Sequence, residues 1–125
     1  MGVEIIIAVG HAGYHRDKEI AKIPDIDLVV GGHSHTFLWN KNDGEQPSND
    51  DPEGEYPTLI KQDGGKEVPV VQAFWGTKYL GYIKLNFSED GEMTSWANKW
   101  NGHSTPILLD NTHDQGIVNY YRIFK

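Results

Sequence analysis

Two apolar, β-branched runs separated by a short amphipathic segment constrain the fold more than any other feature of this chain. The runs cover residues 3–9 and 26–30, and both are typical of strands in a parallel sheet. Residues 15–23 between them have helical spacing, and Pro24 ends the pattern. The first thirty residues therefore predict a strand, a helix and a parallel strand with a right-handed crossover. We expect residues 3–9 to form an interior strand, buried on both faces.

The rest of the chain is typical of loops and β-strands. Residues 42–55 consist mostly of Asp, Asn, Glu, Pro and Gly, which bury little apolar surface, so we expect an exposed, flexible acidic loop. Turn signals at 63–65 and 89–91 separate β-rich runs, which favours an antiparallel β meander. The pattern predicts one α/β domain, or part of one, with four segments: the strand–helix–strand unit with histidine loops at 1–40, the acidic loop at 41–56, the meander at 57–100, and a tail that starts a linking helix at 101–125.

Composition excludes several classes of partner. The chain has 125 residues and a formal net charge of −7, whereas nucleic acids and anionic membranes bind clustered Lys and Arg. No apolar run reaches the ~20 residues of a membrane-spanning helix, and no secretion signal is visible. The absence of cysteine excludes disulfides and zinc–thiolate sites. Asn86 begins an N-glycosylation sequon and is a candidate acceptor if the chain is exported.

Histidines follow both N-terminal apolar runs. His11 comes shortly after the first run, and the second run ends in Gly-Gly-His-Ser-His at 31–35, which carries His33 and His35. Ligands of an open parallel sheet gather beyond the carboxyl ends of its strands, and neighbouring strands lie about 4.8 Å apart. His11 and His33 can therefore reach one metal ion, and His35 can serve the same ion or a second one. Imidazoles without thiolates suit zinc, manganese, iron or cobalt.

Other candidate side chains have simpler interpretations. A two-metal site also needs a bridging carboxylate, and the nearest ones, Asp17 and Asp25, are expected on the helix surface or in a turn. His15 is expected to be solvated, and His103 and His113 lie in polar turn regions and are assigned no role. An aromatic group could line a base-binding pocket, although such residues are more typical of a β core; it comprises Tyr14, Phe37, Trp39, Phe74, Trp75 and Tyr79.

The histidine blocks and their flanks resemble, in order and spacing, the later half of the calcineurin-like metallophosphoesterase domain of the 5'-nucleotidase and apyrase family. The resemblance covers nearly the whole chain, and its blocks are residues 6–14, 17–21, 26–38, 56–58, 68–73, 78–81 and 106–109. It implies a four-layer α/β/β/α sandwich and hydrolysis of nucleoside 5'-phosphates, or of di- and triphosphates in apyrase-like members. The resemblance also implies a parent protein that is secreted or attached to the cell surface.

The same resemblance implies a site with two divalent metal ions. His11 and His33 match the family's ligands for one ion, and His35 matches the position that binds the other. Zinc is the favoured metal, with manganese or cobalt as alternatives, and metal-activated water would attack phosphorus. No catalytic residue is assigned, because the family's Asp-x-His pair, bridging aspartate and Asn-His segment have no counterpart here. The family's C-terminal nucleotide-binding domain is also missing, so the resemblance implies a fragment that is inactive alone and has a weakened or empty metal site.

Two other interpretations stay open. The chain could be a shortened, non-catalytic relative that binds metal, nucleotide or a protein partner through the same sheet. It could also be a plain α/β domain whose histidines are incidental loop residues. The patterns do not choose among nucleoside mono-, di- and triphosphates or nucleotide sugars, and they leave the oligomeric state and a membrane anchor open.

Overall fold

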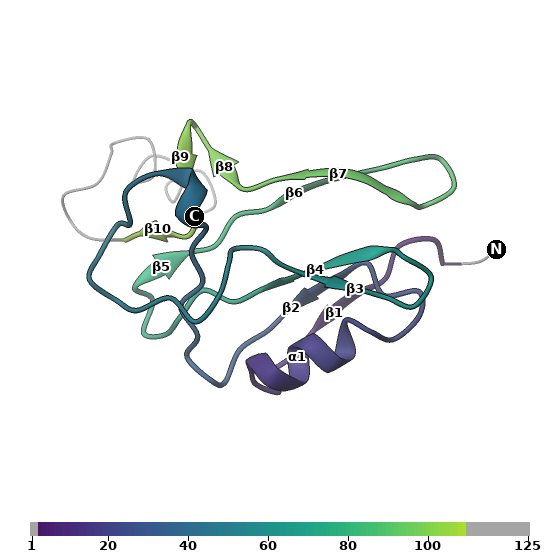
Figure 1. The fold of residues 1–125 in the computed structure, drawn as a ribbon, viewed down its shortest axis with the longest axis horizontal. Coiled ribbons are helices and arrows are strands. Elements are labelled where there is room, and N and C mark those ends of the chain that lie inside the picture. The colour runs from purple at the N-terminus through teal and green to yellow at the C-terminus, as the bar shows by residue number, and fades with distance from the viewer. Residues whose placement is uncertain (1–2, 110–125) are drawn as a thin grey trace, which may run out of the picture.

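The computed structural model describes residues 3–109 of the chain. Figure 1 shows helix α1 lying against a small sheet, with the later strands forming hairpins on the other side. In chain order the elements are β1 (Ile7–Val9), α1 (Tyr14–Ile20), β2 (Leu28–Val30), a 3-10 helix (Lys41–Asp43), β3 (Thr58–Lys61), β4 (Glu67–Val71), β5 (Tyr79–Leu80), β6 (Lys84–Phe87), β7 (Met93–Ala97), β8 (Lys99–Trp100), β9 (His103–Ser104) and β10 (Ile107–Leu108). The end of the tail, where a linking helix is predicted to start, lies outside the described residues.

Four strands form the main sheet, in the order β1-β2-β4-β3. β1 and β2 are parallel, with Ile7 opposite Leu28, so the predicted strand–helix–strand unit is confirmed. β2 is also parallel to β4, and β4 is antiparallel to β3 through the hairpin at 63–65. The hairpin prediction is therefore correct, but its assignment to a separate meander is wrong. β4 is buried along most of its length and takes an interior place beside β2.

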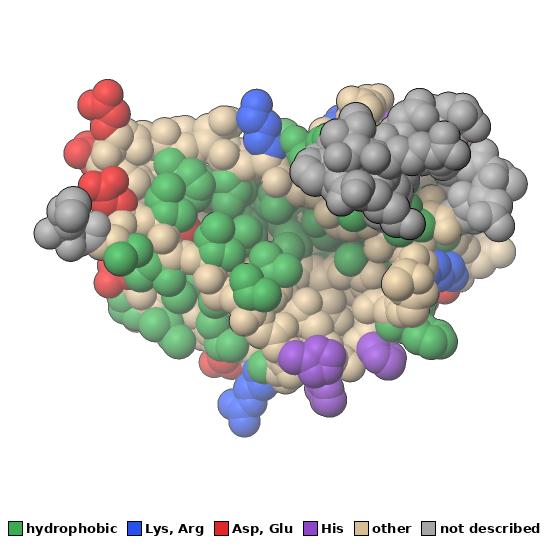
Figure 2. Space-filling model, turned by 180° about the vertical axis from the view of Figure 1, so that it is seen from behind, with side chains coloured by type: hydrophobic (Ala, Val, Ile, Leu, Met, Phe, Trp, Pro, Cys, Tyr) green, Lys and Arg blue, Asp and Glu red, His purple; other side chains and the backbone are tan. Residues whose placement is uncertain are grey.

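β1 lies at the edge of the main sheet, so the prediction that residues 3–9 form an interior strand is wrong. Ile7 is 51% exposed and Val9 is 78% exposed. Within residues 3–109 no strand pairs with the outer side of β1. Ile7 and Val9 are two residues apart, so their side chains project from the same face of the sheet. Figure 2 shows hydrophobic side chains over much of the face seen from behind.

Helix α1 is shorter than the helix predicted at 15–23. After Ile20 the chain tightens, because the amides of Lys22 and Ile23 bond to carbonyls three residues back. Ile23 is consequently 53% exposed and does not join the apolar face of the helix, whereas Ala21 closes that face and is buried. Over residues 3–109 no helix has the length and apolarity needed to cross a membrane.

Beyond the main sheet, the strands described up to residue 109 form three two-stranded sheets rather than one meander. β6 and β7 make a hairpin around 89–91 as predicted, and β6 alternates exposed and half-buried side chains. β8 pairs with β9, and β5 pairs with β10. Between β7 and β8 the buried Asn98 side chain donates to Asp43 Oδ2 at 2.6 Å and to Tyr56 O at 2.9 Å.

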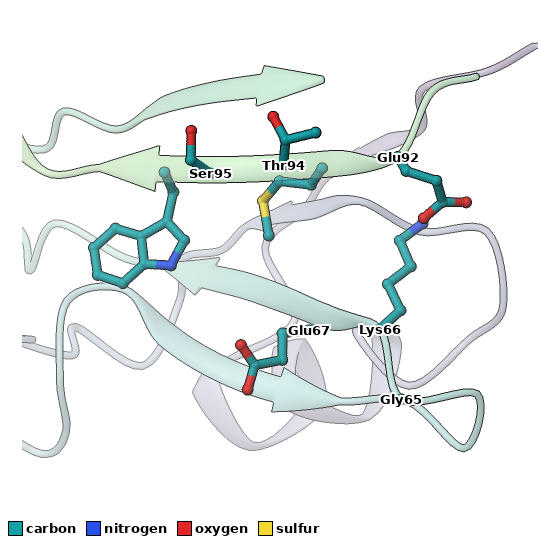
Figure 3. Close-up of a pocket in the computed structure, with 8 residues that line it drawn as sticks. Gly65, Lys66, Glu67, Glu92, Thr94 and Ser95 are labelled. Atoms are coloured by element: carbon teal, nitrogen blue, oxygen red, sulfur yellow. The ribbon is translucent and has the colours of Figure 1, made fainter. Parts of the chain in front are cut away.

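An open cleft of about 550 Å³ lies between the β3–β4 hairpin and β7. Figure 3 shows Lys66 and Glu92 reaching toward each other at one end of it. The ion pair of Lys66 is with the buried Asp27, whose Oδ1 lies 2.6 Å from Lys66 Nζ. Because β4 begins at this cleft and runs parallel to β2, the cleft lies at the amino end of the sheet, opposite the histidine loops.

The acidic loop at 41–56 is held against the rest of the molecule. Asp43 accepts the hydrogen bond from Asn98, and Asp50 Oδ2 pairs with Lys78 Nζ at 2.5 Å and accepts from the Tyr79 hydroxyl. Both carboxylates belong to half-buried residues, so the expected exposure of the loop is confirmed only in part. The flexibility of the loop stays a prediction.

Two apolar clusters make up the core. The larger joins α1 to the main sheet through residues such as Val29. The second contains Phe37, Trp39 and Tyr79, with the rings of Phe37 and Tyr79 stacked 4.8 Å apart. Core packing, favoured for the aromatic group, is confirmed for these three residues, whereas Trp75 is 57% exposed.

Candidate metal centre

The first two strands of the main sheet end side by side and bring two histidines together. After β1 the amide of Gly10 donates to Val30 O at 3.0 Å, so the chain passes the end of β2 before it reaches His11. The imidazole rings of His11 and His33 lie 5.1 Å apart between centroids, at an interplanar angle of 71°. The predicted convergence of these two side chains is confirmed. In Figure 2 the histidines visible from behind gather along one border of the molecule.

The loop that carries His33 and His35 has an unusual backbone. Both histidines are in the left-handed region, with φ of 74° at His33 and 53° at His35. Side chains with a Cβ atom rarely adopt this conformation, so surrounding contacts must hold it. Ser34 between them accepts a hydrogen bond from the Tyr14 amide at 2.9 Å, which joins the loop to the start of α1.

Gln72, the residue that follows β4, forms hydrogen bonds with the loop that carries His33 and His35. Its Oε1 accepts from the Thr36 amide at 2.6 Å, and its Nε2 donates to Gly32 O at 3.1 Å. The side chain is 3% exposed. Sequence analysis did not identify Gln72; the available signal was a polar residue directly after the apolar run at 68–71.

Asp17 is fully buried beside the same loop, so its expected place on the helix surface is wrong. Space for it exists because Gly31 has no side chain: a Cβ atom there would lie 2.0 Å from Asp17 Oδ2. Burial raises the pKa of the Asp17 carboxyl, while hydrogen bonds from Gln72 and Gly32 and the charge of His11 oppose the rise. The sequence signal for the burial of Asp17 was its helical spacing from Tyr14 and Ala21, which places the three residues on one face of the helix.

His35 has a different neighbour from the other two metal candidates. Its ring stacks on the Trp75 indole, with centroids 5.5 Å apart and planes 21° apart. Its assignment to a second ion stays a prediction. Asp25 is exposed with φ of 68°, as expected for a turn residue, and His15 is exposed as expected for a solvated side chain. His103 lies in β9, and His113 lies outside the described residues.

The two neighbouring imidazoles supply part of a ligand set. A catalytic zinc ion takes three protein ligands and keeps a position for water. Within the described segment no group of three or more His, Cys, Asp and Glu side chains is arranged to hold a metal ion. His11 and His33 thus fit two positions around one ion, and a complete set would need further donors.

Several known proteins are similar in sequence to this chain. Protein 5NUC from Lutzomyia longipalpis is 47% identical over 90% of the chain, and the 5'-nucleotidase of Homo sapiens is 46% identical over 98%. A snake venom 5'-nucleotidase from Macrovipera lebetinus is 43% identical over 88%. These matches span 18%, 21% and 25% of the three proteins, so the chain covers about a quarter of their length or less. No protein-family model matches the chain.

Two solved structures share the fold. The 5'-nucleotidase precursor from Thermus thermophilus superposes with a TM-score of 0.68 at 37% identity, covering 77% of this chain and 18% of that one. The NAD nucleotidase from Haemophilus influenzae gives a TM-score of 0.67 at 30% identity, covering 74% of this chain and 16% of that one. Sequence and mixed α/β fold together show that the chain belongs to the 5'-nucleotidase family and corresponds to a segment of its members.

Proposed function

We propose that this chain is the part of a nucleotide phosphohydrolase that supplies His11 and His33 to a catalytic divalent metal ion. The observation that carries the proposal is the pair of imidazoles, with ring centroids 5.1 Å apart, at the ends of two neighbouring parallel strands. The similar proteins named 5'-nucleotidase point to nucleoside phosphates as substrates. In the whole protein we expect this sheet to belong to one layer of a four-layer α/β/β/α sandwich.

The chain's own residues would bind and orient the metal. Both imidazoles must be neutral to offer a nitrogen lone pair. Each side chain is exposed beyond the carboxyl ends of β1 and β2, where substrate can approach. When bound, a divalent ion of this kind supplies an activated water and stabilises charge on the phosphoryl oxygens. His35 is assigned to a second ion of the same site. Zinc is the favoured metal, with manganese or cobalt as alternatives.

The bridging carboxylate and the nucleoside-binding groups belong elsewhere in the parent protein under this proposal. Asp17 does not serve as the bridge, because its carboxylate is buried between α1 and Gly31. We therefore expect the chain by itself to hydrolyse nucleotides no faster than buffer does. An extracellular location is proposed from the relatives that are named as snake venom proteins.

Calorimetric zinc titration of the chain tests the metal assignment. We expect His33→Ala and His11→Ala each to weaken zinc binding by at least about tenfold, since each removes a donor atom. His15→Ala is the matched control, because His15 is an exposed histidine on α1. Equal titrations of all four proteins would show that the histidines are incidental. Joining the chain to the adjoining segment of its gene should restore phosphatase activity; a folded, zinc-binding but inactive product would favour a non-catalytic relative.

A further inference from the structure

We propose that Gln72 is the positioning residue that holds His33 and His35 in their left-handed conformation. The contacts of its amide group carry the proposal, and they do not depend on a bound metal. Only the expected effect on zinc binding rests on the proposed function.

The Gln72 amide spans the histidine loop from one side to the other. Before the histidines, Nε2 donates to Gly32 O at 3.1 Å. After them, Oε1 accepts from the Thr36 amide at 2.6 Å, and between them Oε1 accepts from the Ser34 hydroxyl at 3.3 Å. Nε2 also donates to Asp17 Oδ2 at 3.3 Å. The amide thus uses two donor and two acceptor interactions, which is its full capacity.

The backbone conformation of the loop needs such hydrogen bonds to stabilise it. The φ values of 74° at His33 and 53° at His35 are unfavourable for residues with a side chain, so without external contacts the loop would relax to other conformations. Relaxation would move both imidazoles, because each side chain leaves the backbone at one of the strained positions.

Gln72 is well placed to resist that relaxation. It follows β4, whose Val70 and Val71 pair with Val29 and Val30 of β2, so its backbone is fixed to the strand that leads into the loop. The side chain is 3% exposed, so water competes little for its hydrogen bonds. A carboxylate at this position would lack the two donors and would face the buried Asp17.

The chain also offers a matched comparison in Gln62. This glutamine is 9% exposed and its Nε2 donates to the carbonyls of Ala21, Ile23 and Ile26 at 3.0, 2.6 and 3.4 Å. It follows β3 rather than β4 and binds the chain between α1 and β2, not the histidine loop. Replacing either glutamine by methionine keeps the side-chain length and removes the amide.

The experiment compares wild type, Gln72→Met and Gln62→Met by NMR in the absence of metal. We expect Gln72→Met to speed hydrogen exchange of the Thr36 amide on the order of tenfold relative to wild type and to shift the His33 and His35 ring signals. Gln62→Met should lower the melting temperature and leave these signals in place. In the zinc titration, Gln72→Met should weaken binding by about tenfold to a hundredfold, while Gln62→Met should stay within about twofold of wild type.

The outcomes separate the two proposals. Unchanged Thr36 exchange and histidine signals in Gln72→Met, or equal changes in both variants, would overturn the positioning role. If wild type binds no zinc because the chain supplies only part of the ligand set, the titration is made on the chain joined to the adjoining segment of its gene, and the metal-free measurements decide the role of Gln72. If Gln72→Met does not fold, Gln72→Asn decides instead, since it keeps an amide beside Asp17 but is one methylene shorter and cannot reach both Gly32 and Thr36. Faster exchange of the Thr36 amide with displaced His33 signals would support the proposal, and unchanged exchange and signals would overturn it.

Discussion

The carboxylate of Asp17 occupies the space where a side chain on Gly31 would begin: a Cβ atom at Gly31 would lie 2.0 Å from Oδ2 and 2.5 Å from Cγ of Asp17. Asp17 is fully buried, so it cannot swing into solvent to make room. Helix α1 and the end of β2 therefore meet through a contact that only glycine permits.

Gly31→Ala should consequently destabilise the fold. We expect a loss of about 1–3 kcal/mol in the free energy of unfolding, typical of an overpacked interior. Urea denaturation followed by circular dichroism measures it. Gly10→Ala is the control, because Gly10 holds the corresponding place after β1 and a Cβ atom there has no atom within 4 Å. Equal stability of the two variants would contradict the contact.

The Tyr79 hydroxyl should make the chain sensitive to alkali. Burial, reinforced by the hydrogen bond to Asp50, raises the pKa of Tyr79 from 10.0 to about 12. The folded state then holds this proton more tightly than the unfolded state, so the stabilisation is complete below pH 10 and is lost as the pH rises toward 12. The free energy of unfolding should therefore fall by about 2–3 kcal/mol over this pH range.

Unfolding free energies of wild type and Tyr79→Phe across this pH range test the assignment. Tyr79→Phe should show a shallower decline, and the remaining decline should come largely from Tyr56, whose pKa burial also raises. Identical slopes in the two proteins would show that Tyr79 does not titrate in this way.

The uncovered apolar side chains of β1 should bind hydrophobic dyes and promote association. Ile7 and Val9 lie two residues apart on this edge strand and are 51% and 78% exposed. Ile7→Lys with Val9→Lys should reduce the fluorescence of a bound naphthalene sulfonate dye and shift sedimentation toward the monomer. Leu59→Lys on β3, at the other edge of the sheet, should change both readings far less. A dye-silent wild-type monomer would indicate that the chain is a self-sufficient domain.

Asn86 should accept an N-linked glycan when the chain is expressed through a eukaryotic secretory pathway. The residue is exposed on β6, and its Nδ2 makes one side-chain hydrogen bond, to Ser95 Oγ at 2.8 Å, which must open for modification. Mass spectrometry should find a glycan that Asn86→Gln and Ser88→Ala both remove. The exposed Asn101, which has no sequon, should stay unmodified.

Local sequence patterns were sufficient to predict the parallel pairing of β1 and β2 and the turns at 63–65 and 89–91. Strand period and turn chemistry operate over a few residues, so they are visible in the sequence itself. The meeting of His11 and His33 followed from the same information, because both histidines come just after strands that pair in register.

The chain's order of residues determined where its strands end and which imidazoles follow them. Only the tertiary structure decided that β1 lies at an edge, that β4 inserts beside β2, and that Asp17 and Gln72 meet beneath the histidine loop although they are 55 positions apart. Burial and long-range hydrogen bonding depend on which distant segments pack together, and no local period records that choice. The positions of the histidines were therefore predictable, while the contacts that hold them were not.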